Sequence, residues 1–414
     1  MTMSYPSPIL TFNNVQAPFP LLDIQTKAVQ DFIARKRGSV TFATGIGKTA
    51  VALESIRVLI QGRHANNALF VVPRLALMQQ FRTEASRWKV PEGLIGVFYG
   101  AEKNPRPMTF ATYQSLLKHP QLMDNYDIVI FDEVHIVSGE KMGSLIDRSM
   151  SRPYVLGLSA TIPKSMTELR KMLPVIADAS IQTGVEVGRL AEPRLVQVPI
   201  QLGRSDHRMV VDATRRMDNC VSSLSAMGYI KRDSDIFGLL KAEFPGKVKA
   251  LAYTYVGARA RRNKVLSAAE VKFEALVAII EEHLNERIMV FAESVSAIEK
   301  LCGYLEEQGI RAENISAKTT MPERAKIFQE FGDKFNVLVS VKTLEIGVDL
   351  KMMGLQGDVG IAVILASGRE AIQQTQRMGR VLRAHTDKDR ALIYAIYSPE
   401  FESHMVRQIQ KLIT

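Results

Sequence analysis

The sequence contains little cysteine and no long apolar run. Its 414 residues include two cysteines, Cys220 and Cys302, which fit neither a disulfide framework nor a zinc site, because both need cysteines at paired spacings. No apolar run approaches the ~18 to 20 residues that span a bilayer, and the N-terminal residues do not combine a basic start with an apolar segment. We therefore expect a soluble, cytoplasmic protein without a membrane partner.

The charge is unbalanced towards lysine and arginine. Lys and Arg number 53 against 43 Asp and Glu, a net charge of +10, and 46% of the residues are hydrophobic. The apolar content is enough for the cores of two domains, which is the number that this length favours. The positive charge favours a polyanionic partner, although many basic proteins bind nothing specific.

Short apolar runs alternate with helical patterns in two separate sets. The strand-like runs are residues 40–43, 69–72, 109–111, 128–131 and 155–158, and then 288–291, 337–341, 361–365 and 391–397. This alternation predicts two α/β domains, each with a parallel sheet between helices and with its ligands beyond the carboxyl ends of the strands. We predict an irregular arm at 1–20, a first domain at 21–190, a basic, mostly helical connection at 191–275 and a second domain at 276–414.

A glycine-rich segment at 43–49 follows the first of these runs. Gly45 and Gly47 free backbone N–H groups at the start of a helix, where an anion binds well. Lys48 supplies a charge for the β- and γ-phosphates of a nucleotide, and the Thr49 hydroxyl can ligate magnesium. The usual pattern has a further glycine where this sequence has Phe42, so a chance glycine-rich turn stays open as an alternative.

Two adjacent carboxylates end the apolar run at 128–131. Such a run describes a buried parallel strand whose tip carries Asp132 and Glu133 into a cleft. Asp132 is expected to hold magnesium, and Glu133 to orient and deprotonate an attacking water. His135 follows two residues later; it is either an ordinary polar residue or a link from the nucleotide site to a neighbouring motif.

Two arginines near the C-terminus have helical spacing. Arg380 and Arg383, preceded by Gln376, lie three residues apart, so they can point at one anionic target. Charge on a transferring phosphoryl group is such a target, and a solvated basic helix is the alternative.

The segment between the two sets of strands is strongly basic. Residues 231–272 hold ten Lys or Arg against four Asp or Glu, with Phe237, Phe244, Tyr253 and Tyr255 interleaved. Basic and aromatic side chains together suit a surface that grips phosphates and stacks on unpaired bases. A solvated helical face with its aromatics turned inwards explains the pattern equally well. The arginines to test first are Arg259, Arg261 and Arg262.

Taken in order, these segments resemble the motifs of superfamily 2 helicases and translocases. The matching fragments are Gln25 and residues 42–49, 72–77, 111–114, 132–135, 159–161, 289–291, 347–349 and 376–383. Residues 377–385 and the serine at 340 are most similar to the DNA enzymes around XPB, RecG and the phage helicase UvsW. The resemblance implies two tandem RecA-like domains, a bacterial or phage-infected cytoplasm, and ATP and Mg²⁺ as cofactors.

The resemblance also implies roles for individual residues. Nucleotide contacts come from Gln25, Thr44, Gly45, Ile46, Gly47, Lys48, Thr49, Gly347 and Asp349, with Thr49 and Asp132 at the metal and with Gln376, Arg380 and Arg383 from the second domain. Nucleic-acid contacts come from Pro73, Arg74, Thr112, Tyr113, Gln114, Glu293, Ser294 and either Ser340 or Thr343. His135, Ser159 and Thr161 connect hydrolysis with movement, unless Ser159 and Thr161 merely complete a turn.

These expectations converge on an ATP-driven motor that acts on nucleic acid. The leading hypothesis is a monomeric DNA helicase or translocase that unwinds or branch-migrates forks and four-way junctions in recombination, replication or repair. Two alternatives stay open: an RNA helicase of the D-E-x-H type, and a clamp that uses ATP only to change conformation.

Overall fold

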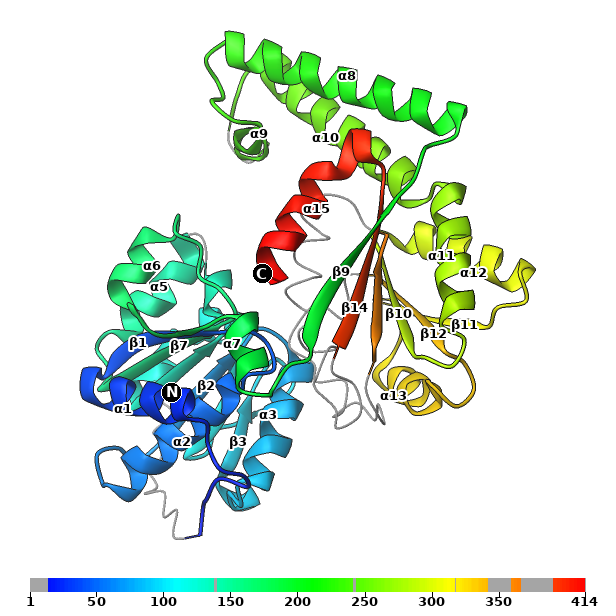
Figure 1. The fold of residues 1–414 in the computed structure, drawn as a ribbon. Helices are drawn as coiled ribbons and strands as arrows, with labels where there is room; N and C mark the ends of the chain where they lie inside the picture. Colours follow the sequence, from blue (N-terminus) through cyan, green and yellow to red (C-terminus); the bar gives the residue numbers. More distant parts are fainter. Residues whose placement is uncertain are drawn as a thin grey trace.

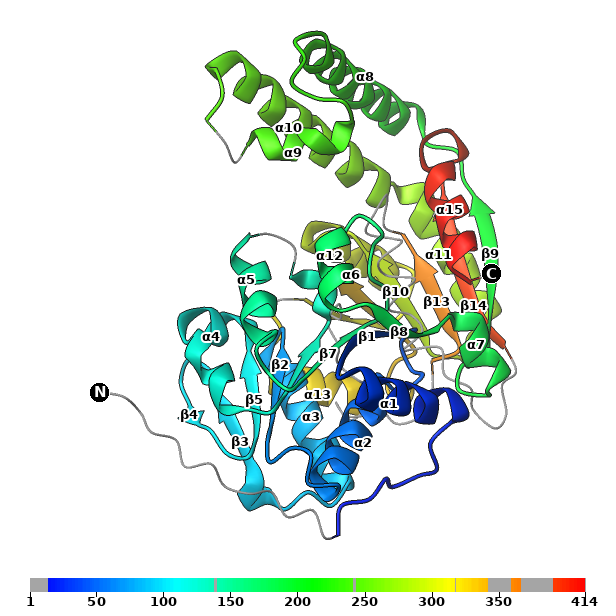
Figure 2. The same ribbon diagram turned by 90° about the vertical axis from the view of Figure 1, so that its left-hand side faces the viewer.

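The computed structural model describes residues 14–137, 140–240, 243–316, 318–341, 359–365 and 390–413. Figure 1 shows two lobes and a pair of long helices that projects from the second lobe. Each lobe is built on a mostly parallel sheet with helices on its two faces, as Figure 2 shows from the side. Over these residues no helix combines the length and the apolarity that a membrane crossing requires.

Lobe 1 contains an eight-stranded sheet in its described part. Its strands, in spatial order, are β4 (Lys103–Asn104), β3 (Ile95–Phe98), β5 (Met108–Thr112), β2 (Ala68–Val72), β6 (Ile128–Asp132), β7 (Tyr154–Ser159), β1 (Arg37–Phe42) and β8 (Val175–Ala179). The paired strands run parallel except at β3 and β4. The carboxyl ends of β5, β2 and β6 therefore lie side by side at one edge of the sheet.

Helices cover both faces of this sheet because its strands are apolar on both sides. One face packs against α1 (Asp23–Arg35), α2 (Lys48–Gln61) and α3 (Leu75–Arg87), through residues such as Phe70 and Ile130. The other face packs against α4 (Tyr113–Lys118), the 3₁₀ helix η2 (Pro120–Asn125), α5 (Glu140–Ser149) and α6 (Thr167–Met172), through residues such as Val129 and Phe131. A short helix, α7 (Ile181–Glu186), follows β8.

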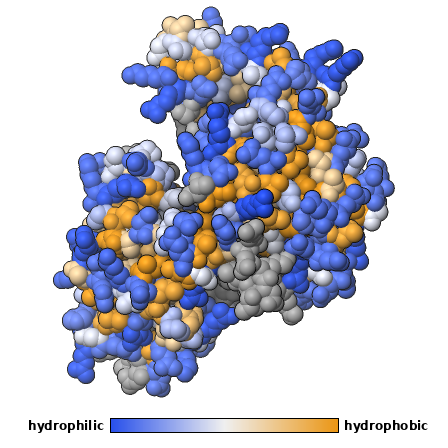
Figure 3. All heavy atoms as spheres, in the orientation of Figure 1, coloured by the Kyte–Doolittle hydropathy of each residue, from blue (hydrophilic) through white to orange (hydrophobic). Residues whose placement is uncertain are grey.

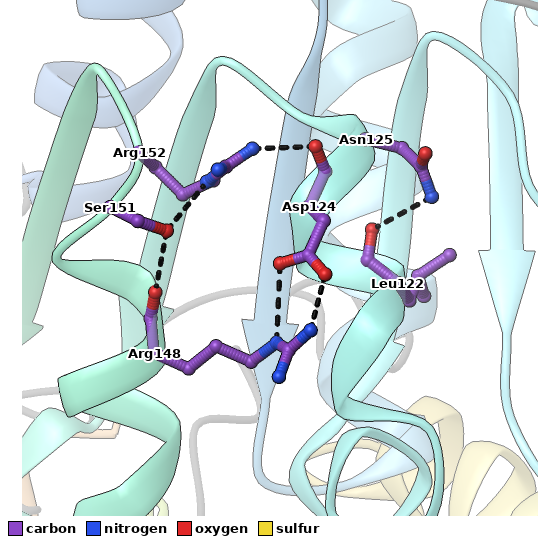
Figure 4. Close-up of polar contacts among 6 residues, drawn as sticks. All are labelled: Leu122, Asp124, Asn125, Arg148, Ser151 and Arg152. Atoms are coloured by element: carbon purple, nitrogen blue, oxygen red, sulfur yellow. Dashed lines mark hydrogen bonds and ion pairs between the residues drawn. The ribbon is translucent and has the colours of Figure 1, made fainter.

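Polar contacts join η2 to α5 at the opposite end of these strands. The Arg148 guanidinium forms an ion pair with Asp124, Arg152 Nη1 donates to the carbonyl of Asp124 over 2.5 Å, and Ser151 Oγ donates to the carbonyl of Arg148 over 3.0 Å (Figure 4). The Arg148 and Asp124 side chains are 42% and 40% exposed. This cluster fixes the turns that lead into β6 and β7 and lies far from their carboxyl ends.

Lobe 2 contains a six-stranded parallel sheet in its described part. Its strands are β11 (Ala312–Ile315), β12 (Val337–Val341), β10 (Ile288–Ala292), β13 (Ile361–Ile364), β14 (Arg390–Tyr397) and β9 (Glu192–Pro199). One face packs against α11 (Glu270–Glu282) and α12 (Val295–Glu307), and the other against α13 (Met321–Glu330) and α15 (Pro399–Ile413).

The projecting part is a helical insert with a core of its own. It comprises α8 (Arg204–Ala226), η4 (Asp233–Asp235), α9 (Ile236–Leu239) and α10 (Gly246–Ser267). Leu224, Ile236, Val248 and Tyr255 are among the buried residues that pack these helices together. The insert therefore has packing of its own beside the cores of the two lobes.

Side chains at the base of the insert attach it to lobe 2. Arg262 donates to Thr214 Oγ1 over 3.2 Å and to the carbonyl of Phe401 over 2.9 Å. His207 lies 2.9 Å from Glu400, and Asn263 donates to Glu293 over 2.8 Å. Two helices of the insert are thus joined to α15 and to the end of β10.

A buried ion pair completes this junction. Lys272, on α11, is 0% exposed, and its ammonium lies 2.9 Å from the carboxylate of Glu402, which is 1% exposed. Both Glu402 oxygens lie 2.9 Å from the ammonium, and Oε2 also accepts the N–H of Ser398 over 2.8 Å. Removal of one partner would leave a buried charge without its counter-ion, which costs several kcal/mol.

The nine strand-like runs predicted from the sequence are confirmed as strands. Residues 191–275, predicted as a mostly helical connection, begin with a strand, because β9 pairs with β14 along its whole length and belongs to the second sheet. Strands β3, β8 and β11 were not predicted. β8 and β11 are only partly buried, so the local apolar pattern that marks a strand is weak in these two.

Candidate active site

The glycine-rich segment forms a tight turn between β1 and α2. Gly45 and Gly47 have φ values of 96° and 95°, which glycine adopts without the steric cost of a Cβ atom. A Cβ on Gly47 would also lie 2.3 Å from Gln25 Nε2. The turn therefore requires glycine at 47, and it directs the first N–H groups of α2 to one place, as a phosphate-binding loop does.

Gln25 and Lys48 brace this turn from two sides. Gln25 is 1% exposed; its Nε2 donates to the carbonyl of Ile46 over 2.7 Å, and its Oε1 accepts the N–H of Leu22 over 2.9 Å. The Lys48 ammonium donates to the carbonyl of Phe42 over 2.8 Å. Phe42, the departure from the usual motif, is a fully buried residue of β1, so the missing glycine leaves the turn itself intact.

The acid pair lies at the carboxyl end of β6. Asp132 is 7% exposed and Glu133 is 9% exposed, which places both carboxylates in a shielded position where a nearby cation or proton is held strongly. Glu133 has φ 50° and ψ 47°, the left-handed region. This conformation is unfavourable for a residue with a Cβ atom and is typical of functional sites.

His135, Ser159 and Thr161 form one hydrogen-bonded cluster beside the acid pair. Ser159 Oγ donates to the carbonyl of Thr161 over 2.6 Å and accepts the Thr161 N–H over 3.2 Å. The hydroxyl proton is thereby used, so the 2.8 Å contact with His135 Nδ1 has the imidazole as donor. The same Nδ1 lies 3.3 Å from a Glu133 oxygen. The cluster thus connects the end of β7 to the acid pair.

Residues predicted to contact nucleic acid lie at the ends of β2 and β5. Arg74 and Gln114 are exposed and Pro73 is half-buried. Thr112 is 8% exposed and caps α4 by accepting the Ser115 N–H over 3.2 Å. These residues lie along the same sheet edge as the acid pair, two strands away at most.

Tyr113 requires a correction. Its side chain is 1% exposed and its hydroxyl donates to the carbonyl of Asp132 over 2.9 Å. A side chain enclosed in this way has no surface to offer to a nucleic acid, so Tyr113 is a buried residue of lobe 1. At the start of α4, Gln114 is exposed while Thr112 and Ser115 are buried like Tyr113.

Lobe 2 contributes fewer described residues to the site. Ser294 is half-buried and caps α12 by accepting the Ala297 N–H over 3.2 Å. Ser340 is 0% exposed within β12, which leaves Thr343 as the better candidate of that pair. The remaining candidates from this lobe lie outside the described residues: Thr343, Gly347, Asp349, Gln376, Arg380 and Arg383.

Arg324, on α13, is a candidate that the sequence did not suggest. Its guanidinium donates to the carbonyls of Thr319 and Ser316 over 3.0 and 2.8 Å. Burial lowers the pKa of Arg324, and the positive charge of Arg74 lowers the pKa further. Two arginines from different lobes therefore lie within electrostatic reach. A single arginine in an ordinary helical segment gives no sequence signal for this.

The three arginines of the insert have different environments. Arg261 is exposed, and Arg259 places its guanidinium 5.3 Å from the ring centre of Phe237. Arg262 is half-buried and its guanidinium is bonded within the protein, so its assignment to nucleic-acid binding is corrected to a structural one. Phe237 and Tyr253 are 39% and 62% exposed, whereas Tyr255 is 4% exposed.

Comparisons with known proteins agree with this geometry. Residues 18–164 match the family model of the type III restriction enzyme res subunit, and residues 271–385 match that of the helicase conserved C-terminal domain. The fold is similar to the crystal structure of the Pyrococcus furiosus Hef helicase domain, with a TM-score of 0.62 at 16% identity, over 95% of this chain and 98% of the other.

Similar sequences extend over nearly the whole chain. The DNA 3'-5' translocase XPB2 of Sulfurisphaera tokodaii is 26% identical over 91% of this chain and 83% of its own length. The DNA 3'-5' helicase XPB of Mycobacterium tuberculosis is 23% identical over 95% of this chain and 64% of its own length. Putative helicase 22 of a Sulfolobus islandicus filamentous virus is 22% identical over 93% of this chain and 65% of its own length. With both helicase domains matched and the two-lobed fold in place, the chain belongs to the superfamily 2 DNA helicases and translocases, with homologues of the XPB type.

Proposed function

We propose that this protein is an ATP-dependent DNA translocase that moves in the 3'-5' direction and separates strands at branched DNA. The observation that carries the proposal is the shared edge of the first sheet. The phosphate-binding turn, the acid pair and the candidate strand contacts at Arg74 and Gln114 follow the carboxyl ends of β1, β6, β2 and β5, which lie on one edge of the sheet with β7 between β1 and β6. A conformational change at the bound nucleotide can therefore reach the nucleic acid across the ends of these strands.

The residues of lobe 1 fit a magnesium nucleotide. Gln25 lies against the turn where an adenine base would be read, the N–H groups at the start of α2 and the Lys48 ammonium suit the phosphates, and Thr49 and Asp132 offer oxygens to Mg²⁺. When bound, ATP·Mg²⁺ supplies a phosphoryl group whose transfer to water releases free energy. Glu133 orients the attacking water and accepts its proton.

The residues around Glu133 hold it in position for this step. His135 Nδ1, 3.3 Å from the Glu133 carboxylate, orients the acid, and Ser159 fixes the imidazole in turn. Arg380 and Arg383 are proposed to reach the same phosphates from lobe 2 and to stabilise charge in the transition state. Closing of the lobes around the nucleotide and reopening after hydrolysis would carry a bound strand from one lobe to the other.

The helical insert supports branched DNA as the substrate. It presents Arg261, Phe237 and Tyr253 to solvent, with the half-buried Arg259 beside the Phe237 ring, a combination that contacts phosphates and stacks on unpaired bases. Figure 3 shows an open space between the projecting helices and lobe 1 on this face. We propose that one arm of a fork lies there while the lobes hold the tracking strand.

A panel of nucleic acids tests the substrate. Phosphate release would be measured with single-stranded DNA, duplex DNA, a fork, a four-way junction and single-stranded RNA, and strand displacement with forks that carry either a 3' or a 5' tail. We expect the largest stimulation with the fork or the junction, and displacement from the 3'-tailed fork.

Other results would favour the alternatives. Stimulation by RNA above that by any DNA would identify an RNA helicase. Nucleotide-dependent DNA binding without phosphate release would identify a clamp. Displacement of the 5'-tailed fork alone would contradict the proposed direction.

A further inference from the structure

Tyr113 connects two strand ends that are not neighbours. It is the first residue of α4, directly after β5, and its hydroxyl donates to the carbonyl of Asp132 at the end of β6 over 2.9 Å. In the sheet, β2 lies between β5 and β6, so the side chain and its hydrogen bond together bridge about 10 Å, or two strand spacings. Its ring is stacked on Phe131 with centres 6.0 Å apart, which limits its movement.

The carbonyl that Tyr113 holds belongs to the peptide bond between Asp132 and Glu133. The orientation of that rigid peptide plane sets φ of Glu133, which is 50° and lies in the unfavourable left-handed region. Such a conformation persists when surrounding contacts determine it. The hydrogen bond from Tyr113 is one such contact, so the tyrosine acts on the direction of the Glu133 side chain without touching the carboxylate.

The hydroxyl of Tyr113 stays a hydrogen-bond donor under physiological conditions. Burial, and then the negative charges of Asp132 and Glu133, raise the pKa of Tyr113 well above its ordinary value. Ionisation would put a third negative charge beside the acid pair, and a phenolate could no longer donate to the carbonyl.

The side chain of Tyr113 is buried, but its backbone adjoins the residues predicted to contact the strand. Its chain neighbours are Thr112, which caps α4, and Gln114, whose side chain is exposed. We propose that Tyr113 is a positioning residue that transmits the binding of a nucleic-acid strand at the start of α4 to the orientation of Glu133. The inference rests on the proposed function, because it requires hydrolysis that nucleic acid stimulates.

The test is the full-length Tyr113→Phe variant, which keeps the ring and removes the hydroxyl. Its kcat and KM for ATP would be measured with and without single-stranded DNA, together with the Kd for that DNA and the melting temperature. We expect kcat in the presence of DNA to fall about 5- to 10-fold, which is the equivalent of one hydrogen bond. The ratio of stimulated to basal kcat should fall at least about threefold, since the bond matters most when the strand holds α4. KM and the DNA Kd should stay within about twofold, because the hydroxyl touches neither ligand.

Tyr126→Phe is a matched control in the same lobe. Tyr126 is 4% exposed and its hydroxyl donates to Thr109 Oγ1 over 2.7 Å, before the start of β6 and remote from the acid pair. This variant loses a comparable buried hydrogen bond, so its melting temperature should fall by about as much as that of Tyr113→Phe. Its basal and stimulated kcat should both be retained.

The outcomes separate the inference from the proposed function. An unchanged stimulation ratio in Tyr113→Phe overturns the inference, whether kcat is retained or falls equally with and without DNA. A fall of the ratio in Tyr126→Phe to the same extent also overturns it, because the effect would then be general loss of stability. Failure of DNA to stimulate the wild-type protein would instead refute the proposed function.

Discussion

The acid edge of lobe 1 and the helical insert hold their polar groups in opposite ways. At the acid edge, Asp132 and Glu133 are 7% and 9% exposed, and Tyr113 and His135 contact them directly. In the insert, Tyr253 is 62% exposed and Arg261 is exposed. The first region is held by internal contacts before any ligand arrives, and the second presents exposed side chains on its surface.

This difference corresponds to two kinds of work. Chemistry on a phosphoryl group gains most from groups that are already oriented, because reorientation during the reaction costs free energy. Contacts with a nucleic-acid backbone are numerous, similar and individually weak, so mobile side chains serve well. We therefore expect changes at the acid edge to alter kcat, and changes in the insert to alter affinity and its dependence on salt.

The largest effect is expected at Glu133. Glu133→Gln keeps the size of the side chain and removes its ability to accept a proton, so DNA-stimulated phosphate release should fall by about 10³-fold or more. The Kd for DNA should stay within about threefold, because the carboxylate does not reach the strand. Glu168→Gln, at an exposed position of α6, should retain full activity; a comparable loss there, or retained turnover in Glu133→Gln, would contradict the comparison.

Lys272→Met extends the comparison to the junction between the insert and lobe 2. The substitution leaves Glu402 charged in a site that is 1% exposed, so we expect a loss of about 3 to 5 kcal/mol in the stability of lobe 2. Thermal unfolding would show it as a clear drop in the melting temperature. The control is Lys171→Met, because Lys171 is exposed on α6. An equal melting temperature for the two variants would argue against a buried charge pair.

The double variant Arg259→Ala, Arg261→Ala tests the insert. Loss of two phosphate contacts should weaken DNA binding about tenfold and reduce the slope of log K against log salt by about 2. Basal phosphate release should be unchanged. Binding would be measured by fluorescence anisotropy between 50 and 200 mM salt, the range over which such contacts weaken.

Arg262→Ala is the matched control for this test, because Arg262 is next to Arg261 in the sequence. Its guanidinium is bonded to Thr214 and Phe401 within the protein, so we expect a lower melting temperature and an unchanged salt slope. A reduced salt slope in Arg262→Ala would contradict the assignment of Arg259 and Arg261, rather than Arg262, to nucleic-acid binding. An unreduced slope in the double variant would contradict it as well.

The smallest effect is expected in the cluster of Figure 4. Arg148→Ala removes an ion pair whose side chains are 42% and 40% exposed, and pairs this exposed contribute about 0 to 1 kcal/mol. Melting should shift by a few degrees at most and kcat should not change. A change in kcat would show that the amino ends of the strands also influence the acid edge.

Local sequence was sufficient to predict the turn and the acid pair. The glycines, Lys48 and the carboxylates of 132 and 133 each follow an apolar strand directly, so a short window contains both the structure and the chemistry. The same holds for the runs that became β6, β10 and β12. In each of them nearly every residue is apolar because both faces of the sheet are covered.

Burial that depends on tertiary packing was not predictable in this way. Nothing in the sequence around Tyr113 shows that α4 turns this residue inwards and Gln114 outwards. Likewise, β9 is separated by 190 residues from its partner β14, and Arg262 differs from Arg261 only in the side of α10 that it occupies. To predict the burial of Tyr113 and Arg262, or the strand β9, one must know which elements pack against α4, α10 and β9.

The central claim is that the edge of lobe 1 hydrolyses ATP in response to DNA. Phosphate release from ATP by the wild-type protein and by Lys48→Ala, each with and without single-stranded DNA, tests it most directly. The account predicts release that DNA increases in the wild-type protein and that is abolished in the variant under both conditions. Undiminished release by Lys48→Ala would contradict it.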